Sequence, residues 1–573
     1  MYNPEKITYF AETDSRNKRV AFGIKAKDRL KHVYVIGKTG MGKSTLLENM
    51  AVQDIKGNEG MAFIDPHGKT AELLLEYVPP ERIKDVIYFA PFDTEYPISF
   101  NVMEDVGIDK RHLVANGLMS AFKKIWVDAW SARMEYILNN ILLALLEYPG
   151  STLIGVNRML SDKTYRDKIV ENVKDPSVKS FWVDEFAKYG EKYMQEAGAA
   201  IQNKIGQFIS NPLVRNIIGQ ERSSFDIRKL MDDGKIMIIN LSKGRVGEAN
   251  ANLIGSMLIT KIYLAAMSRA DKADAELQKL PNFYLYVDEF QSFANESFAD
   301  ILSEARKYKL NLTIAHQYIE QMEEEVRAAV FGNVGTMITF RVGAYDAEVL
   351  EKEFAPTFTA EDLVNLGSYQ IYLKLMIDGI GSQPFSARTL APIEKPSASS
   401  VEEIVRNSRR VYAEPKLEVE KKIQAWHEEG RMAKPEKKPE RKYEPRAVER
   451  RADERRTDER RTYAPKPAYV PKPQPPREPM PSSDDFKPLK SISLDALKQK
   501  SDNQRPQSQK NVSELRNALS SIVKNTPVPA PSNQTNSRAL PASGLRRDSN
   551  SPDSSPPKKN GPSPEELKAL LDA

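Results

Sequence analysis

A glycine-rich segment near the start of the chain matches the phosphate-loop pattern G-x-x-x-x-G-K-[ST], the Walker A motif. An apolar stretch, residues 32–36, precedes it, and a helical pattern, residues 44–55, follows it. Glycines let backbone N–H groups converge on phosphate oxygens, and the helix N-terminus adds partial positive charge. We therefore expect Lys43 to reach the β- and γ-phosphates of ATP and Ser44 to bind Mg²⁺. The predicted nucleotide-binding residues are Gly37, Lys38, Thr39, Gly40, Met41, Gly42, Lys43, Ser44 and Thr45.

Two adjacent acidic residues, Asp288 and Glu289, directly follow the apolar stretch 283–287. At the end of a strand, Asp288 can hold Mg²⁺ through water and Glu289 can polarise the water that attacks the γ-phosphate. An acidic pair can also do no more than cap a strand. Its occurrence in the same chain as a phosphate loop favours the catalytic interpretation, a Walker B motif.

Polar residues follow two further predicted strands. Residues 311–315 lead into His316 and Gln317, and we expect Gln317 to report the γ-phosphate to the rest of the protein. His316 is interpreted as a core residue rather than a base. The segment 65–68 (Asp-Pro-His-Gly) also follows a strand, at the edge where such sheets bind ligands, but these residue types are equally typical of a plain turn.

Hydrolysis also requires positive charge on the γ-phosphate in the transition state, often from an arginine of a neighbouring subunit. Each candidate can equally be a surface ion-pair residue, and spacing alone does not choose among them. The candidates are Arg215, Arg245, Arg306 and Arg341.

These residues must be positioned by an α/β fold, because apolar strands alternate with helical periods over the first 400 residues. We expect a RecA-like, mostly parallel sheet with flanking helices, an all-α insertion domain and a long disordered C-terminal tail. The predicted strands are 32–36, 61–65, 86–90, 236–241, 283–288, 312–315, 337–340 and 370–376. The predicted helices after the first strands are 110–125, 132–147, 163–173, 178–189, 193–209, 400–411 and 416–427.

The expected domains follow from this pattern and from a change of composition near residue 431. More than half of the 37 prolines lie beyond that point, with charge runs that cannot bury enough apolar area to fold. Three serine-capped leucine patterns in the tail are either transient helices or docking peptides. The domains are 1–100, the first part of the ATPase domain; 101–233, the all-α insertion; 234–395, the second part of the ATPase domain; 396–432, C-terminal helices; and 433–573, a disordered, proline-rich, basic tail.

Composition excludes several other classes of protein. The chain has no cysteine, so disulfides, thiolate metal sites and cysteine nucleophiles are absent. The most apolar segment, 136–156, is interrupted by polar residues and is interpreted as a buried helix, and the N-terminus does not resemble a signal peptide. Residues 433–573 carry 29 basic against 19 acidic residues, whereas the first 432 carry 55 against 60. Contact with nucleic acid must therefore come from local basic patches.

The motifs together resemble the conjugative coupling ATPases of type IV secretion (TraG/TraD-like), which belong with the HerA and FtsK-like DNA-pumping ATPases. The similarity is carried by VIGKTGMGKSTLLENM, FIDPHGKT, YLYVDEFQSFANESFADILSEARKYKLNLTIAHQYIEQM and IYLKLMIDG, and covers roughly residues 5–430. It implies a hexameric ring that threads DNA and hydrolyses ATP between subunits. It also implies that Arg306 is the arginine that acts in trans, that Gln317 ends the sensor strand, and that the insertion helps to select substrate.

The resemblance implies an ATP hydrolase that translocates DNA, with ATP and Mg²⁺ as cofactors, and feeds a conjugation-like channel. Expected partners are DNA, bound without sequence preference, further copies of the chain, and channel or relaxase-type proteins bound through the all-α domain or the tail. Coupling proteins usually carry N-terminal transmembrane helices, whereas only 36 residues precede the phosphate loop here. We therefore expect a cytoplasmic protein without a span of its own, held at the inner face of the membrane by a partner if it acts there.

Three alternatives remain open at this point. The lack of a predicted transmembrane segment favours a HerA-like motor that processes DNA ends together with a nuclease. An ATPase that energises protein transport or assembly fits the leucine patterns of the tail. A non-enzymatic nucleotide switch would require that Glu289 and Arg306 lack the roles given above. The strandedness of the DNA, the polarity of movement and the resting oligomeric state do not follow from the sequence.

Overall fold

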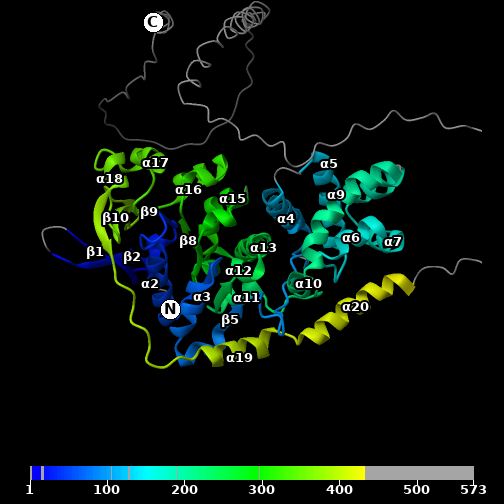
Figure 1. Ribbon diagram of the computed structural model, residues 1–573, viewed down its shortest axis with the longest axis horizontal. Helices are drawn as coiled ribbons and strands as arrows, with labels where there is room; N and C mark the ends of the chain where they lie inside the picture. The colour runs from blue at the N-terminus through cyan, green and yellow to red at the C-terminus, as the bar shows by residue number, and fades with distance from the viewer. Residues whose placement is uncertain are drawn as a thin grey trace, which may run out of the picture. The chain divides into compact units, whose positions relative to one another are not determined.

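The computed structural model describes residues 3–14, 18–104, 106–126, 130–189, 191–295 and 297–432. The predicted disordered tail, 433–573, lies outside the described residues. An eleven-stranded sheet runs in the order β2-β1-β13-β10-β9-β3-β8-β7-β4-β6-β5, seen on the left of Figure 1. Its strands are β1 Ile7–Thr13, β2 Ala21–Lys25, β3 Val33–Ile36, β4 Gly60–Asp65, β5 Val86–Phe89, β6 Ile236–Asn240, β7 Phe283–Val287, β8 Leu310–His316, β9 Thr336–Thr339, β10 Gln370–Lys374 and β13 Phe385–Thr389.

The strands from β9 to β5 pair in parallel, and the remaining four pair antiparallel at one side of the sheet. The predicted α/β, mostly parallel, RecA-like fold class is therefore confirmed. All eight predicted strands are present within a few residues. The strands β1, β2 and β13, and the small hairpin formed by β11 Met376–Ile377 and β12 Ile380–Gly381, were not predicted.

Helices cover both faces of the sheet. Side chains of β3 alternate between two cores, Tyr34 and Ile36 facing one and Val33 and Val35 the other. The helices that pack about the sheet are α2 Lys43–Lys56, α3 Lys69–Glu76, α12 Lys243–Val246, α13 Glu248–Met267, α15 Ser297–Glu304, α16 Glu324–Asn333, α17 Ala344–Phe354, α18 Ala360–Val364 and α19 Val401–Tyr412. Two short helices lie beside them, α1 Ala26–Arg29 and α14 Asp274–Leu277.

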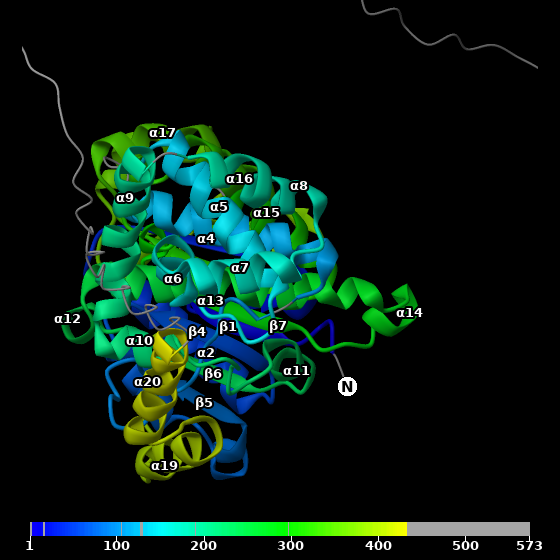
Figure 2. The same cartoon turned by 90° about the vertical axis from the view of Figure 1, so that its right-hand side faces the viewer.

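Between β5 and β6 the described residues form helices and no strand, as the sequence pattern predicted. The longer helices are α4 Arg111–Ile125, α5 Ala132–Glu147, α7 Lys163–Asn172 and α9 Glu191–Ser210, and the shorter ones are α6 Gly155–Ser161, α8 Pro176–Ser180, α10 Pro212–Ile218 and α11 Ile227–Asp232. This helical insertion, cyan in Figures 1 and 2, lies beside the sheet, and α20 Lys416–Met432 packs against its α10.

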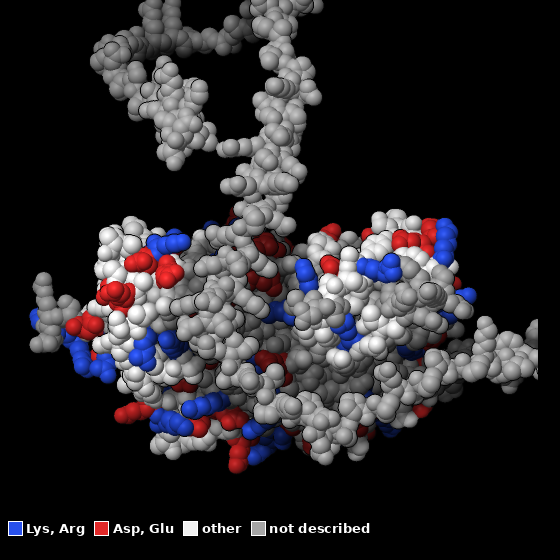
Figure 3. Space-filling model, turned by 45° about the horizontal axis from the view of Figure 1, so that its top comes forward, with Lys and Arg blue, Asp and Glu red and all other residues white. Residues whose placement is uncertain are grey.

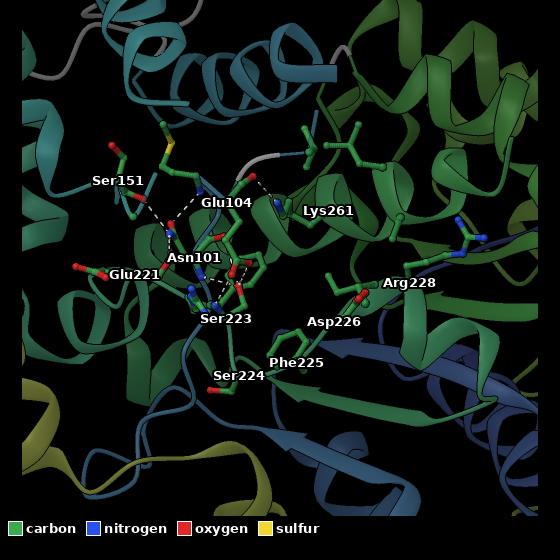
Figure 4. Close-up of a pocket in the computed structure, with 18 of the residues that line it drawn as sticks. Asn101, Glu104, Ser151, Glu221, Ser223, Ser224, Phe225, Asp226, Arg228 and Lys261 are labelled. Atoms are coloured by element: carbon green, nitrogen blue, oxygen red, sulfur yellow. Dashed lines mark hydrogen bonds between the residues drawn. The ribbon is translucent and has the colours of Figure 1, made fainter. Parts of the chain in front are cut away.

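The chain enters and leaves the insertion at one place. The side-chain nitrogen of Asn101 donates to the carbonyl oxygens of Ser151 at 2.9 Å and Glu221 at 2.8 Å. The hydroxyl of Ser223 donates to the Glu104 carboxylate at 2.6 Å. These residues line a cavity of about 860 Å³ (Figure 4). The incoming and outgoing segments are thus fastened to each other beside the sheet.

One helix among the described residues, Glu248–Asp271, is long and apolar enough to cross a membrane. It contains α13, and 72% of its most apolar window is buried inside the protein. Its apolar character is therefore explained by its place in the core. The segment 136–156, predicted as a buried helix, instead forms most of α5, a connection and the start of α6.

Candidate nucleotide site

The glycine-rich loop connects β3 to α2 at the carboxyl edge of the parallel strands. Gly40 and Gly42 have φ of 78° and 117°, a left-handed conformation that glycine adopts without a steric penalty. Gly42 directly precedes α2, so the unpaired N–H groups of the first helical turn, which includes Ser44 and Thr45, border the loop. Met41 instead packs into the core. The loop can therefore cradle phosphate, as its sequence predicted.

The buried side chain of Lys43 extends back to the start of the glycine-rich loop. Its ammonium donates to the carbonyl oxygens of Gly37 at 2.6 Å and Lys38 at 3.2 Å. Burial lowers the pKa of Lys43, while the nearby carboxylates of Glu289 and Asp288 favour its charged form. The charge thus lies where the loop would hold the phosphates of a nucleotide.

The two predicted magnesium ligands, Ser44 and Asp288, are brought together. The Ser44 hydroxyl donates to a carboxylate oxygen of Asp288 at 3.4 Å. Burial, followed by the carboxylates of Glu289 and Asp65, raises the pKa of Asp288 to about 6. A divalent cation would stabilise the ionised carboxylate. Among the described residues no group of three or more His, Asp or Glu side chains could hold a metal alone, so Mg²⁺ here would also need phosphate and water ligands, as is usual for this ion.

Glu289 has a left-handed backbone, with φ of 48°. Its carboxylate accepts hydrogen bonds from the side-chain amides of Gln317 and Gln291 and lies 3.9 Å from Nε2 of His67. Burial alone would raise the pKa of Glu289, but the interactions with His67, Gln317 and Gln291 lower it to about 2. The carboxylate is therefore ionised at neutral pH and can orient a water molecule.

Gln317 joins the glycine-rich loop to Glu289. Its amide oxygen accepts from the Thr39 hydroxyl at 3.1 Å, while its amide nitrogen donates to Glu289. A change at the phosphate end of the loop therefore reaches the carboxylate through one side chain. This geometry suits the predicted sensor role.

The segment after β4 is a turn that also reaches the site. Asp65 is buried and accepts from the backbone N–H groups of His67 at 2.8 Å and Ala71 at 2.9 Å. The turn directs the His67 side chain to Glu289, and this interaction raises the pKa of His67. His67 was not assigned from the sequence, although its place just after a strand end was a signal.

His316 is a buried core residue. Its ring lies 3.2 Å from the Tyr34 hydroxyl, and burial lowers the pKa of His316 to about 3. The ring is therefore neutral at physiological pH, as suits a core position.

The structure separates Arg306 from the nucleotide site of its own chain. Arg306 is exposed in a 3₁₀ turn, Ala305–Tyr308, that precedes β8, whereas Gln317 follows the other end of β8. A strand of this length spans roughly 20 Å at about 3.3 Å per residue. Arg306 therefore lies at the opposite edge of the sheet from the glycine-rich loop of its own chain.

The other candidate arginines have different surroundings. Arg341 adjoins the glycine-rich loop, because its carbonyl oxygen accepts from the Lys38 N–H at 2.8 Å. Arg245 pairs with Glu72 at 3.5 Å. Arg215 lies in α10 of the insertion.

Comparison with known families gives two matches. The model described as the central domain of the helicase HerA matches residues 13–262, which contain the glycine-rich loop. The model described as the TraM recognition site of TraD and TraG matches residues 282–353, which contain Asp288, Glu289, Arg306 and Gln317. These matches confirm the resemblance to TraG/TraD-like coupling ATPases and to HerA that the motifs indicated.

Several solved structures have a similar fold. The unbound bacterial conjugative coupling protein TrwB shares 14% identity at a TM-score of 0.49, covering 69% of this chain and 97% of that one. TrwB in complex with ADP and Mg²⁺ shares 15% at 0.48, covering 66% and 89%. VirB4 of Thermoanaerobacter pseudethanolicus shares 13% at 0.42, covering 68% and 98%. No curated protein matches the chain in sequence.

Proposed function

We propose that this chain, whose sequence matches the HerA and the TraG and TraD family models, is an ATP-dependent DNA translocase that works as a hexameric ring and feeds DNA to a conjugation-like type IV secretion channel. One observation carries the proposal. The groups that bind and hydrolyse ATP gather at the carboxyl edge of the sheet, while the arginine expected to complete them lies at the amino edge. Such a site is completed by a second copy of the chain.

Each side chain of the site then has a role. Lys43 binds the β- and γ-phosphates in place of the carbonyl oxygens it now contacts. Ser44 and Asp288 would hold Mg²⁺, which would supply positive charge against the developing phosphate charge. Glu289 orients and polarises the attacking water, and Gln317 relays the state of the γ-phosphate.

We propose that residues 1–100 and 234–395 hydrolyse ATP and that the insertion, 101–233, helps to select the substrate. Lys and Arg are interspersed with Asp and Glu on the face shown in Figure 3. Residues 1–432 carry 55 basic against 60 acidic residues. DNA contact is therefore proposed to use local basic positions at the phosphate backbone, without base recognition.

We propose that the protein acts in the cytoplasm and is attached to the inner face of the membrane through a partner. The match of residues 282–353 to a TraM recognition site supports a TraM-like protein as one partner. That region lies in the second ATPase part, so such a partner need not use the insertion or the tail.

A HerA-like motor that processes DNA ends with a nuclease is the second candidate, favoured by the match of the HerA model to residues 13–262. The two candidates differ in their response to DNA ends. Stimulation of ATP hydrolysis by linear but not closed circular DNA would favour end processing. Equal stimulation by both would favour the coupling function.

The proposal is tested by the steady-state ATPase rate of the full chain against added single- and double-stranded DNA at several salt concentrations. We expect strong stimulation that fades as salt rises, because counterions compete for each phosphate contact. A rate that does not change with either DNA would contradict the DNA motor and favour the protein-transport alternative.

A further inference from the structure

We propose that Lys124, at the end of α4 in the insertion, is a positioning residue that holds the loop carrying Glu289. Its ammonium donates to the carbonyl oxygen of Gln291 at 2.7 Å and to that of Ala294. The side chain of Gln291 in turn donates to the Glu289 carboxylate. One lysine of the insertion is therefore two contacts away from the carboxylate that orients the attacking water. The inference rests on the proposed role of Glu289.

The loop after β7 needs such support because its backbone is strained at Glu289, where φ is 48°. A residue held in this region persists only when its surroundings determine its conformation. A short 3₁₀ turn, Phe290–Ser292, follows. Lys243 makes a second contact from outside the loop, donating to the Ser292 hydroxyl at 2.9 Å. Two lysines from different helices thus contact the turn.

The contact with these carbonyl groups withdraws the Lys124 ammonium from water, which is unfavourable for its charged form. Burial lowers the pKa of Lys124 to about 8. An ammonium group withdrawn from water requires partners, and the two loop carbonyl oxygens supply them. The contact is therefore a specific one rather than a chance approach of a surface side chain.

Close packing completes the connection between α4 and the loop. A Cβ atom at Gly117 of α4 would lie 2.5 Å from Thr260 of α13, and one at Gly255 of α13 would lie 2.3 Å from the Phe293 ring. The insertion helix, the core helix and the loop therefore touch at two points where no methyl group fits, and Lys124 forms the third contact. In Figure 1, α4 lies beside α13, and the two helices contact each other.

A cavity of about 610 Å³ at this junction leaves the loop room to shift. The side chains that line it include Ala121, Lys124, Lys243, Asn252, Gln291 and Gln321. Because packed elements move as units, a displacement of α4 must either carry the loop with it or break the Lys124 contacts. Substrate contact with the insertion would thus change the rate of hydrolysis rather than the affinity for nucleotide.

The test compares Lys124→Met with Lys179→Met, an exposed lysine on α8 of the insertion, and with Lys124→Arg, which keeps the charge. We expect Lys124→Met to lower kcat roughly tenfold, as for loss of one charge-assisted contact that aligns a catalytic group. Affinity for a fluorescent ADP analogue should stay within about twofold, because the phosphate loop is unchanged. Lys124→Arg should restore most of the rate, and Lys179→Met should match the unmodified protein.

An unchanged kcat in Lys124→Met, or a loss of nucleotide affinity as large as the loss of kcat, would overturn the inference. If Lys124→Met does not fold, Lys124→Gln and Lys124→Arg are compared instead, and equal kcat values overturn it. The double variant with Lys124→Met and Gln291→Ala should lose less kcat than the product of the two single fold-losses, because both residues act on Glu289. Failure of the proposed function would show itself separately, as full turnover in Glu289→Gln.

Discussion

At the scale of single residues, Glu289 shows how the site maintains a charged carboxylate in a partly buried place. Burial opposes ionisation, yet His67, Gln317 and Gln291 supply enough hydrogen bonding to lower its pKa to about 2. The adjacent Asp288 accepts from the Ser44 hydroxyl and the Glu289 N–H, but burial and the carboxylates of Glu289 and Asp65 outweigh these bonds and raise its pKa to about 6. The two neighbouring carboxylates therefore differ as their proposed roles require, Glu289 to orient water and Asp288 to bind a cation.

This difference predicts the behaviour of Glu289→Gln. The variant should bind ATP normally but hydrolyse it about 10²- to 10⁴-fold more slowly, because the amide cannot accept a proton from the attacking water. Single-turnover kinetics and nucleotide titration would separate the two effects. Glu325→Gln, at an exposed position of α16, is the matched control. Normal turnover in Glu289→Gln would exclude the water-orienting role.

The residues that could be predicted from the sequence are those at strand ends. Ser44, Asp288 and Gln317 meet because parallel strands end at the same edge of the sheet, so apolar runs followed by polar residues indicate the site. For His67, its place just after the end of β4 was a signal, but the sequence does not show that the turn directs its side chain to Glu289. Gln291 and Lys124 could not be assigned in this way, because their contacts depend on the paths of a loop and an inserted helix, which no local pattern specifies.

At the scale of elements, the parallel strands were predictable because most are buried on both faces and read as continuous apolar runs. The sequence of β1, ITYFAET, has exposed and buried positions in partial alternation, and β2 is mostly exposed or half-buried. The strand β1 pairs with β2 on one side and with β13, the last strand of the chain to join this sheet, on the other. Such long-range antiparallel pairing leaves little signal in short, half-exposed segments.

The packing of α13 gives a prediction at this scale. Gly255→Ala should lower the free energy of unfolding by about 1–3 kcal/mol, because its Cβ atom would overlap the Phe293 ring. Gly332→Ala is the control, since its Cβ atom would meet nothing within 4 Å on an exposed turn of α16. The control should be neutral or more stable by up to about 1 kcal/mol. Denaturant unfolding measures both, and equal stability of the two variants would refute the close contact.

At the scale of the whole molecule, the opposite placement of Arg306 and the nucleotide site predicts rescue between inactive chains. Arg306→Ala and Lys43→Ala should each abolish hydrolysis alone. In a randomly mixed ring, about a quarter of the interfaces would pair an intact Lys43 with an intact Arg306, so partial activity should return. The measurement is ATPase rate against mixing ratio. Absence of rescue in rings shown by co-purification to be mixed would count against action in trans.

The strands β5 and β6 are hydrogen-bonded neighbours, although the whole insertion separates them in the sequence. Residues 90–235 are thus a single long connection between two adjacent strands of the sheet. The two ends of this connection are hydrogen-bonded to each other through Asn101 and Ser223. Evolution can therefore lengthen, shorten or exchange this module without changing the order of any strand. Under the proposed function, such an exchange would leave the strand-end residues of the nucleotide site in place, provided that the new module kept the contact that Lys124 makes with the loop after β7.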